Sequence, residues 1–275
     1  MMGDVPYLTL NNGVQIPQLG FGMWQVPPDE AVEPIRIALE SGYRHIDTAA
    51  AYGNEEGVGQ AIRESGVPRE HIFVTTKLAN PDHARAAEAF EDSVSKLGLE
   101  YVDLYLIHWP RPDRGDLYVQ AWKALEKILA DGRAKAIGVS NFHQAHLERL
   151  RSEADVVPAV NQIELHPGFN QDELRAFNQQ NGILTEAWSP IGQGKGLLDN
   201  PDLAKIAETV GRTPAQTVLR WHIQLGNIVF PKSVTPSRIR ENIQVFDFEL
   251  DADQMAAISA LPGERIGGNP DTDFF

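Results

Sequence analysis

A chain of 275 residues can form two ordinary domains or one α/β barrel, which takes about 250 residues. Its net charge of -14 argues against nucleic acids and anionic membranes as partners, because both bind basic surfaces. The absence of cysteine excludes disulfides, thiolate catalysis and thiolate-bound zinc, and it is typical of an intracellular protein.

The start of the chain shows no targeting signal. Residues 1–6 lack the basic region and the apolar run of a signal peptide. No apolar stretch approaches the roughly 20 residues that span a bilayer. We therefore expect a cytoplasmic protein with no membrane segment.

Short apolar runs alternate with segments of helical periodicity along the chain. The predicted strands are 18–23, 44–47, 73–78, 102–107, 134–140, 159–163, 183–187 and 228–230. The predicted helices are 28–41, 55–65, 82–97, 117–130, 144–150, 171–180, 214–224 and 236–245. Eight strand–helix pairs with short connections predict one closed parallel (β/α)8 TIM barrel of the α/β class.

Four segments fall outside this count. Asn11-Asn12-Gly13 separates segments 7–10 and 14–17, which predicts a hairpin that covers the N-terminal end of the barrel. Extra helices are expected at 202–210 and 251–259, and a tail at 263–275, rich in Gly, Pro and Asp, should lie irregularly over the barrel. No linker or repeat divides the chain, so we expect one domain over residues 1–275.

Two helix ends carry local signals with a physical cause. Thr213-Pro214 places a capping residue before a proline at the first helical position. Asp131-Gly132 predicts the end of the helix that precedes it, because glycine accepts the left-handed conformation of a helix terminus.

The residues that follow the strands of such a barrel line one mouth, where barrel enzymes build their active sites. These positions hold Trp24, Asp47, Tyr52, Lys77, His108, Trp109, Ser140, Asn141, Gln162, Trp188 and Lys232. Each of them alone has an ordinary structural explanation, such as a core tryptophan or a hydrogen-bonded histidine. A carboxylate, a phenol, an ammonium and an imidazole at successive strand ends are instead typical of a catalytic site.

The chemistry of this set favours carbonyl reduction. The ammonium of Lys77 would lower the pKa of the Tyr52 phenol, and Asp47 would hold Lys77 in an ion pair. His108 would orient a substrate oxygen. A phenol that donates its proton to a carbonyl oxygen requires a hydride for the carbonyl carbon, and only a cofactor supplies hydride.

The segment after the last strand predicts where that cofactor binds. Lys232, Ser233, Thr235 and Arg238 bring cations and hydroxyl groups to the start of a predicted helix, which favours phosphate binding. Lys232 and Arg238 would bind a 2′-phosphate and so select NADPH over NADH. The alternative interpretation is an ordinary capped helix with a solvated basic face.

Three segments in the same order resemble the signatures of the aldo-keto reductases. They are 42–59 with Asp47, Tyr52, Glu55 and Gly59, then 135–142, then Lys232-Ser233 with Arg238 and Glu241-Asn242. The resemblance covers nearly the whole chain and implies a (β/α)8 barrel, NADPH, and a monomer. It also implies a catalytic tetrad in which Tyr52 is the general acid, with Asp47, Lys77 and His108.

The resemblance further implies a set of cofactor contacts. The nicotinamide would stack on Trp188, and its carboxamide would bind Ser140, Asn141 and Gln162. The remaining cofactor positions are Ser189, Lys232, Ser233, Val234, Thr235, Arg238, Glu241 and Asn242.

Within the family, segments 161–167 and 193–196 are most similar to the bacterial 2,5-diketo-D-gluconate reductases. We expect a small carbonyl substrate, an aldehyde, ketone or keto-sugar acid, beside Trp24, Trp109 and Ala79. Ala79 departs from the family pattern, because many relatives carry tryptophan there, and it should widen the substrate pocket. Loops such as the tail usually determine substrate choice.

Two other functions remain open at this stage. A metal-dependent barrel hydrolase could use His45, Asp47, His108 and His166 as ligands, since His45 and Asp47 point to the same side of a strand. It leaves Tyr52 and Lys77 without roles, so we expect no metal. A non-catalytic NADPH-binding protein of the same fold is the second alternative.

Overall fold

Eight parallel strands stand side by side in the computed structural model, which describes residues 5–273. They are β3 (Phe21–Gly22), β4 (His45–Asp47), β5 (Phe73–Leu78), β6 (Val102–Ile107), β7 (Ala134–Ser140), β8 (Val160–Glu164), β9 (Leu184–Trp188) and β10 (Ile228–Val229). Leu19, ahead of β3, pairs with Val229 in a parallel bridge, and the Gly20 amide donates to the Val229 carbonyl at 2.9 Å. The first and last strands therefore meet, and the predicted barrel is confirmed.

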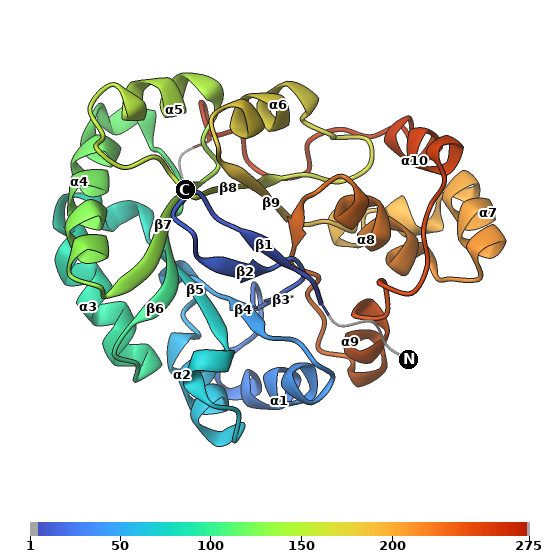
Figure 1. Cartoon of the computed structure of the whole chain (residues 1–275), viewed down its shortest axis with the longest axis horizontal. Helices are drawn as coiled ribbons and strands as arrows, with labels where there is room; N and C mark the ends of the chain where they lie inside the picture. The colour runs from blue at the N-terminus through green and yellow to red at the C-terminus, as the bar shows by residue number, and fades with distance from the viewer. Residues whose placement is uncertain (1–4, 274–275) are drawn as a thin grey trace.

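A helix follows each strand and packs outside the ring, as Figure 1 shows. These helices are α1 (Val32–Glu40), α2 (Glu55–Glu64), α3 (Ala86–Leu97), α4 (Leu117–Ala130), α5 (Gln144–Arg151), α6 (Asp172–Gln180), α8 (Pro214–Gln224) and α9 (Pro236–Asn242). The two extra helices are present as α7 (Pro201–Val210) and α10 (Ala252–Ser259). No helix of the described residues is long and apolar enough to cross a membrane.

Three predicted helices differ from the structure by more than one residue. The segment 28–41 divides into a 3-10 turn, η1 (Pro28–Glu30), and α1, while 82–97 begins in a second 3-10 segment, η4 (Asn80–Arg85), before α3. Helix α9 ends at Asn242, although the pattern predicted 245. Ile243 and Val245 are both buried, and residues two apart cannot share one face of a helix.

The predicted hairpin covers the N-terminal end of the barrel. Strands β1 (Tyr7–Thr9) and β2 (Gln15–Pro17) pair antiparallel, and Leu10 and Ile16 pack into the barrel against Phe73, Leu104 and Phe230. The amide of Asn11 donates to the Pro158 carbonyl at 3.0 Å. This end of the barrel is therefore closed by apolar packing and hydrogen bonds.

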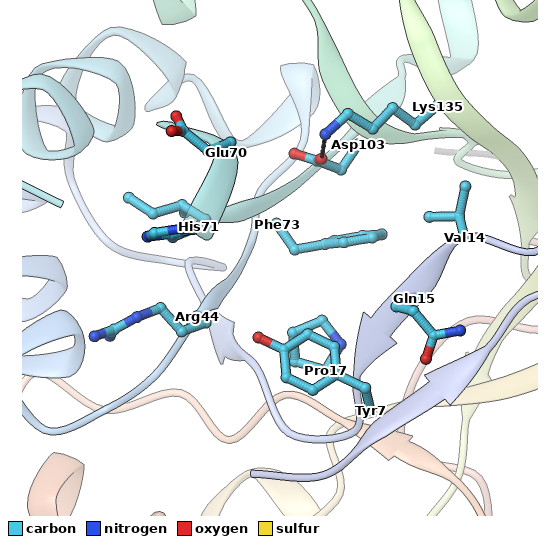
Figure 2. Close-up of a pocket in the computed structure, with 11 residues that line it drawn as sticks. Tyr7, Val14, Gln15, Pro17, Arg44, Glu70, His71, Phe73, Asp103 and Lys135 are labelled. Atoms are coloured by element: carbon cyan, nitrogen blue, oxygen red, sulfur yellow. Dashed lines mark ion pairs between the residues drawn. The ribbon is translucent and has the colours of Figure 1, made fainter. Parts of the chain in front are cut away.

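A cavity of about 300 Å³ lies beside the hairpin at this closed end (Figure 2). Two of its charged side chains, Lys135 and Asp103, form an ion pair. Lys135 lies 2.9 Å from Asp103, and Asp103 also binds Arg69 at 2.8 Å. In parallel barrels this end serves stability, so the cavity is not our candidate site.

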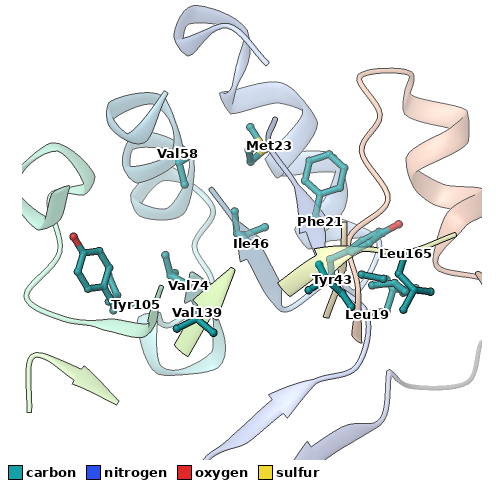
Figure 3. Packing of buried hydrophobic residues seen from close by; sticks show 14 of the residues in the cluster. Leu19, Phe21, Met23, Tyr43, Ile46, Val58, Val74, Tyr105, Val139 and Leu165 are labelled. Carbon is teal, nitrogen blue, oxygen red and sulfur yellow. The ribbon is translucent and has the colours of Figure 1, made fainter. Parts of the chain in front are cut away.

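The main core fills the layer between the strands and the helices (Figure 3). Side chains alternate along the strands: Tyr105 and Ile107 of β6 belong to this outer layer, whereas Leu104 and Leu106 point into the barrel. The interior is apolar at the hairpin end, and polar side chains occupy the opposite end.

Two sequence-based predictions reach outside the described residues. Residues 1–4, part of the segment without signal-peptide features, and 274–275, the end of the predicted tail, lie there. The described part of the tail is irregular, as expected, and crosses the C-terminal ends of β8 and β9, where the Ile266 amide donates to Glu164.

Gly59 tests the packing of α2 against the end of α3. A Cβ at this position would lie 1.9 Å from the Leu97 carbonyl oxygen, which belongs to rigid backbone. Gly59→Ala should therefore lower the free energy of unfolding by about 1–3 kcal/mol, even though alanine favours helices. Urea denaturation measures this loss. Gln60→Ala, at an exposed position of the same helix, is the control and should change stability by less than about 0.5 kcal/mol.

Candidate active site

A buried ion pair lies at the C-terminal ends of β4 and β5. The Lys77 Nζ donates to Asp47 Oδ1 at 2.7 Å and to the Thr48 carbonyl at 2.8 Å. Its third hydrogen points to the Tyr52 hydroxyl, 3.4 Å away. Lys77 is completely buried, so its charge persists only because these three acceptors surround it.

Tyr52 reaches the pair from the loop after β4. It ends a 3-10 turn, η2 (Ala50–Tyr52), and Gly53 follows with a φ of 68°, a conformation that suits glycine. The Tyr52 ring meets the His108 ring edge to face, with centroids 5.7 Å apart. The structure thus brings Asp47, Tyr52, Lys77 and His108 together, as the sequence predicted.

Lys77 acts to lower the pKa of Tyr52, as predicted, but it does not set the net direction. Burial raises the pKa of Tyr52 above its usual value and outweighs the opposing charge of Lys77, while the carboxylate of Asp47 adds to the rise. For Lys77, burial alone would lower the pKa, but Asp47 and Tyr52 raise it above the usual value. At neutral pH the phenol is therefore protonated beside a permanent ammonium.

His108 is neutral in this environment. Burial, followed by the charge of Lys77, lowers the pKa of His108 well below its usual value. Its backbone carbonyl accepts a hydrogen bond from the Asn141 amide at 3.0 Å. A neutral imidazole beside the phenol can hydrogen-bond a substrate oxygen without competing as a charged acid.

A second polar network lies deeper in the barrel and includes a residue that the sequence analysis missed. The Gln162 Nε2 donates to Asp47 Oδ2 at 2.9 Å and to Glu186 Oε2 at 2.8 Å. Glu186 lies within β9, one layer below Trp188, whereas our prediction considered residues at strand ends. An acid inside an otherwise apolar strand was the available signal, since unpaired acids are rarely buried.

The predicted carboxamide-binding residues form a connected set. Asn141 donates to the Ser140 hydroxyl at 3.1 Å, and the Trp188 indole donates to Asn141 Oδ1 at 2.8 Å. The Ser140 hydroxyl donates to the Gln162 carbonyl at 2.8 Å. Asn141, with a φ of 63°, therefore fixes the orientation of the Trp188 ring at the barrel mouth.

The tail is held over this mouth by Glu164, a second residue that the sequence analysis did not single out. Glu164 is buried at the end of β8 and accepts the amides of Ile266 at 2.6 Å and Gly267 at 2.8 Å. A Cβ on Gly267 would lie 2.3 Å from the Trp188 ring. The tail backbone therefore lies directly against Trp188.

Two histidines hold the tail at a point closer to its end. His143 precedes α5, and His146 lies in its first turn. Asp271 lies 2.8 Å from His143 Nδ1 and 3.2 Å from His146 Nε2. The His146 Nδ1 accepts the His143 amide, so its Nε2 carries the hydrogen that faces Asp271. The other His143 nitrogen faces the Arg265 guanidinium, which only donates. In these tautomers both histidines donate a hydrogen bond to Asp271 and thereby hold the tail.

The segment that is predicted to bind phosphate carries two positive charges without acidic partners among the described residues. Lys232 is partly buried and Arg238 is exposed, and neither forms an ion pair with a described residue. Ser233 accepts the Thr235 amide at 3.0 Å, and Val234 is 46% exposed. The Glu241 carboxylate accepts a hydrogen bond from Thr213 at the start of α8.

The remaining predicted positions lie on the loops of the mouth. Trp24 follows β3 and is 41% exposed, while Trp109 follows His108 and is partly buried. Ala79 is partly buried at the start of η4. Asn242 is buried at the end of α9, and the Ser189 hydroxyl accepts a hydrogen bond from Gln193.

The sequence and fold match proteins that are already classified. Residues 18–262 match the model of the aldo/keto reductase family. The chain belongs to the aldo/keto reductase family. The match spans all eight barrel strands and the segment that carries Lys232 and Arg238.

This reductase is similar to other proteins over nearly its full length. A methylglyoxal reductase, DkgA, from Escherichia coli K12 is 51% identical, with 98% of each chain covered. An aldo/keto reductase from Brucella melitensis has a crystal structure with a TM-score of 0.91 and 55% identity, covering 94% of this chain and 98% of that one. A Gox0644 variant crystallised with NADPH has a TM-score of 0.94 and 46% identity, covering 99% and 100%.

The structure does not bring together the residues that were predicted as metal ligands of the alternative hydrolase. The His45 ring lies deep in the barrel against Phe73 and Phe230, and its Nε2 bonds the Thr75 hydroxyl at 2.9 Å. His166 bonds Glu164 at 3.0 Å. Within residues 5–273, neither histidine belongs to a group of side chains that could share a metal ion.

The buried ion pair predicts a strong coupling between Asp47 and Lys77. Lys77→Met leaves a buried carboxylate without its cation and should lower the free energy of unfolding by about 3–5 kcal/mol. The double variant Asp47→Asn, Lys77→Met removes both charges and should lose less than the sum of the two single losses. Urea denaturation of the four proteins measures the coupling. Additive losses would show that the pair does not stabilise the fold as a unit.

Proposed function

We propose that this protein reduces the carbonyl group of small aldehydes and ketones to alcohols with NADPH. The observation that carries the proposal is the Lys77 ammonium, which is buried 3.4 Å from the Tyr52 hydroxyl and held by Asp47. The family and the names of the relatives, among them a methylglyoxal reductase and a structure with NADPH, support the same reaction.

Tyr52 is the proposed proton donor. Its phenol is protonated at neutral pH because burial raises its pKa, so the proton is available before each turnover. When the proton passes to the carbonyl oxygen, the phenolate that remains lies beside the Lys77 ammonium. This fixed positive charge acts on the negative charge that develops during transfer and not on the neutral phenol, which favours the transition state.

His108 is the proposed contact for the substrate oxygen. The edge-to-face packing with Tyr52 places both polar side chains at one side of the mouth. Because its imidazole is neutral, it can hydrogen-bond the carbonyl and leave the proton transfer to Tyr52.

NADPH, when bound, supplies a hydride to the carbonyl carbon. The residues present fit this cofactor, since Lys232 and Arg238 have no acidic partner among the described residues and suit a 2′-phosphate. Trp188, oriented by Asn141, offers a flat ring for the nicotinamide, with Ser140 and Gln162 beside it. Both Gln162 amide hydrogens are already bonded to carboxyl groups, so it would receive the carboxamide through its oxygen.

The substrate is proposed to be a small carbonyl compound that is either uncharged or carries one carboxylate. Trp24 and Trp109 would give the pocket apolar walls, and the small Ala79 side chain leaves room beside Lys77. Methylglyoxal and keto-sugar acids such as 2,5-diketo-D-gluconate both belong to this class. The tail, which Glu164 holds, is proposed to close the other side of the substrate pocket.

Tyr52→Phe tests the reaction against the non-catalytic alternative. The variant should lose reductase activity by roughly 100-fold or more, because the proton donor is gone. Its affinity for NADPH should stay within about threefold of the wild type, since the cofactor contacts are unchanged. Absorbance at 340 nm with a panel of aldehydes, α-keto esters and keto-sugars measures turnover, and fluorescence titration measures NADPH affinity. Unchanged turnover in the variant rules out Tyr52 as the donor.

Lys232→Ala and Arg238→Ala test the cofactor preference. Each should weaken NADPH binding roughly 10- to 100-fold and NADH binding much less, because only NADPH carries the 2′-phosphate. Dissociation constants for both cofactors provide the measurement. Arg240→Ala is the matched control on the same helix, exposed like Arg238, and should change neither affinity. Equal losses for NADPH and NADH would refute the position of the 2′-phosphate.

A further inference from the structure

Glu186 is a carboxyl group inside the barrel that has no cationic partner within residues 5–273. It lies on β9, two residues before Trp188, and its side chain is completely buried. One oxygen accepts the hydrogen bond from Gln162 at 2.8 Å, and the other, Oε1, has no partner among the described residues. Such an arrangement requires an explanation, because buried polar atoms are normally hydrogen-bonded.

The surroundings of Glu186 indicate a neutral acid. Lys77 is the cation whose charge acts on it, but the three Lys77 hydrogens already face Asp47, Thr48 and Tyr52. A buried carboxylate without a partner takes up a proton, because its desolvation costs more than protonation. In agreement, burial raises the pKa of Glu186 to about 8, and the charge of Asp47 adds to the rise.

The Gln162 amide connects Glu186 to the candidate active site. Its nitrogen donates to both carboxyl groups, at 2.9 Å to Asp47 and 2.8 Å to Glu186. Gln162 and Glu186 are direct neighbours in the pairing of β8 with β9, so the sheet fixes their separation. The other Asp47 oxygen binds Lys77 at 2.7 Å. A continuous chain of hydrogen bonds therefore runs from Glu186 to the ammonium beside Tyr52.

We propose that Glu186 is a positioning residue for the reduction: as a neutral acid it fixes the Gln162 amide and thereby the Asp47–Lys77 pair against Tyr52. This inference rests on the proposed function. The neutral form matters, since an ionised Glu186 would add a second negative charge to the network around Lys77 and oppose the effect of the Lys77 charge on Tyr52. That charge would disfavour proton transfer to the substrate.

Other titratable groups of the barrel interior do not replace Glu186 in this role. They are Asp47 and His45 on β4, Lys77 on β5, Glu164 on β8, and Tyr52 and His108 at the mouth. Burial lowers the pKa of His45 to about 3, so it stays neutral near pH 8. Glu164 is bonded to the tail and to His166.

Glu186→Gln imitates the neutral acid with an amide of the same shape. Its kcat at pH 7 should stay within about threefold of the wild type, whereas Glu186→Ala, which removes the contact to Gln162, should lose roughly tenfold or more. The wild-type kcat should fall as the pH rises through about 8. The Glu186→Gln variant should keep its kcat to higher pH. The measurement is a kcat–pH profile from pH 6 to 10 with saturating NADPH and the carbonyl compound that is reduced fastest.

Thermal unfolding gives a readout that is independent of turnover. Because the pKa of Glu186 is raised from 4.5 to about 8, folding takes up a proton in this range, and the stability of the wild type falls as the pH rises through it. Glu186→Gln lacks this loss, so its Tm relative to the wild type should increase from pH 5 to pH 8. Glu208→Gln, an exposed substitution on α7, is the control and should show no such trend.

The outcomes separate this inference from the proposed function. If Tyr52→Phe is inactive but Glu186→Gln has the wild-type pH profile and no pH-dependent Tm difference, the role of Glu186 is refuted and the proposed function stands. If Tyr52→Phe is active, the proposed function and the positioning role both fail. A shifted profile together with the Tm trend supports the proposal, even if Glu186→Ala does not fold.

Discussion

The buried ammonium of Lys77 is the constraint on which the rest of the candidate active site depends. A completely buried lysine remains charged only if acceptors replace its water, and three do so, from Asp47, Thr48 and Tyr52. This requirement fixes the loop after β4, because Thr48 and Tyr52 both belong to it. The same charge acts on the pKa values of Tyr52 and His108.

The carboxyl groups around this charge have different environments and therefore different states. Asp47 is paired with a cation, whereas Glu186 accepts a hydrogen bond from the Gln162 amide alone among the described residues and has a raised pKa. Glu164 has a lowered pKa: burial alone would raise it, but His166 and two backbone amides of the tail outweigh that effect. The barrel interior thus contains an ion-paired acid, a neutral acid and an acid that holds a loop. The number of hydrogen-bond donors around each carboxyl group decides its state.

Local signals in the sequence predicted the framework well. Strands β5, β6 and β7 and helices α4 and α8 have the predicted bounds. The cap at Thr213 forms as expected, with its side chain and that of Gln216 bonded reciprocally to backbone amides. The residues at strand ends could be identified as well, since a parallel barrel brings every strand end to one mouth. The 3-10 segments η1 and η4 were missed because hydrophobic spacing does not separate a 3-10 turn from the first turn of a helix.

By itself the sequence determined the order of strands and helices, the family, and the side chains that meet at the barrel mouth, because these follow from periodicity, caps and motifs within short segments. Only the tertiary structure decided the net direction of the pKa of Tyr52, the contact of Glu186 with Gln162, and the attachment of the tail to Glu164. Burial and hydrogen bonding depend on neighbours that are distant in the chain, such as Glu164 and Ile266, which are 102 residues apart. Desolvation is a property of the packed interior, and no short segment of sequence contains it.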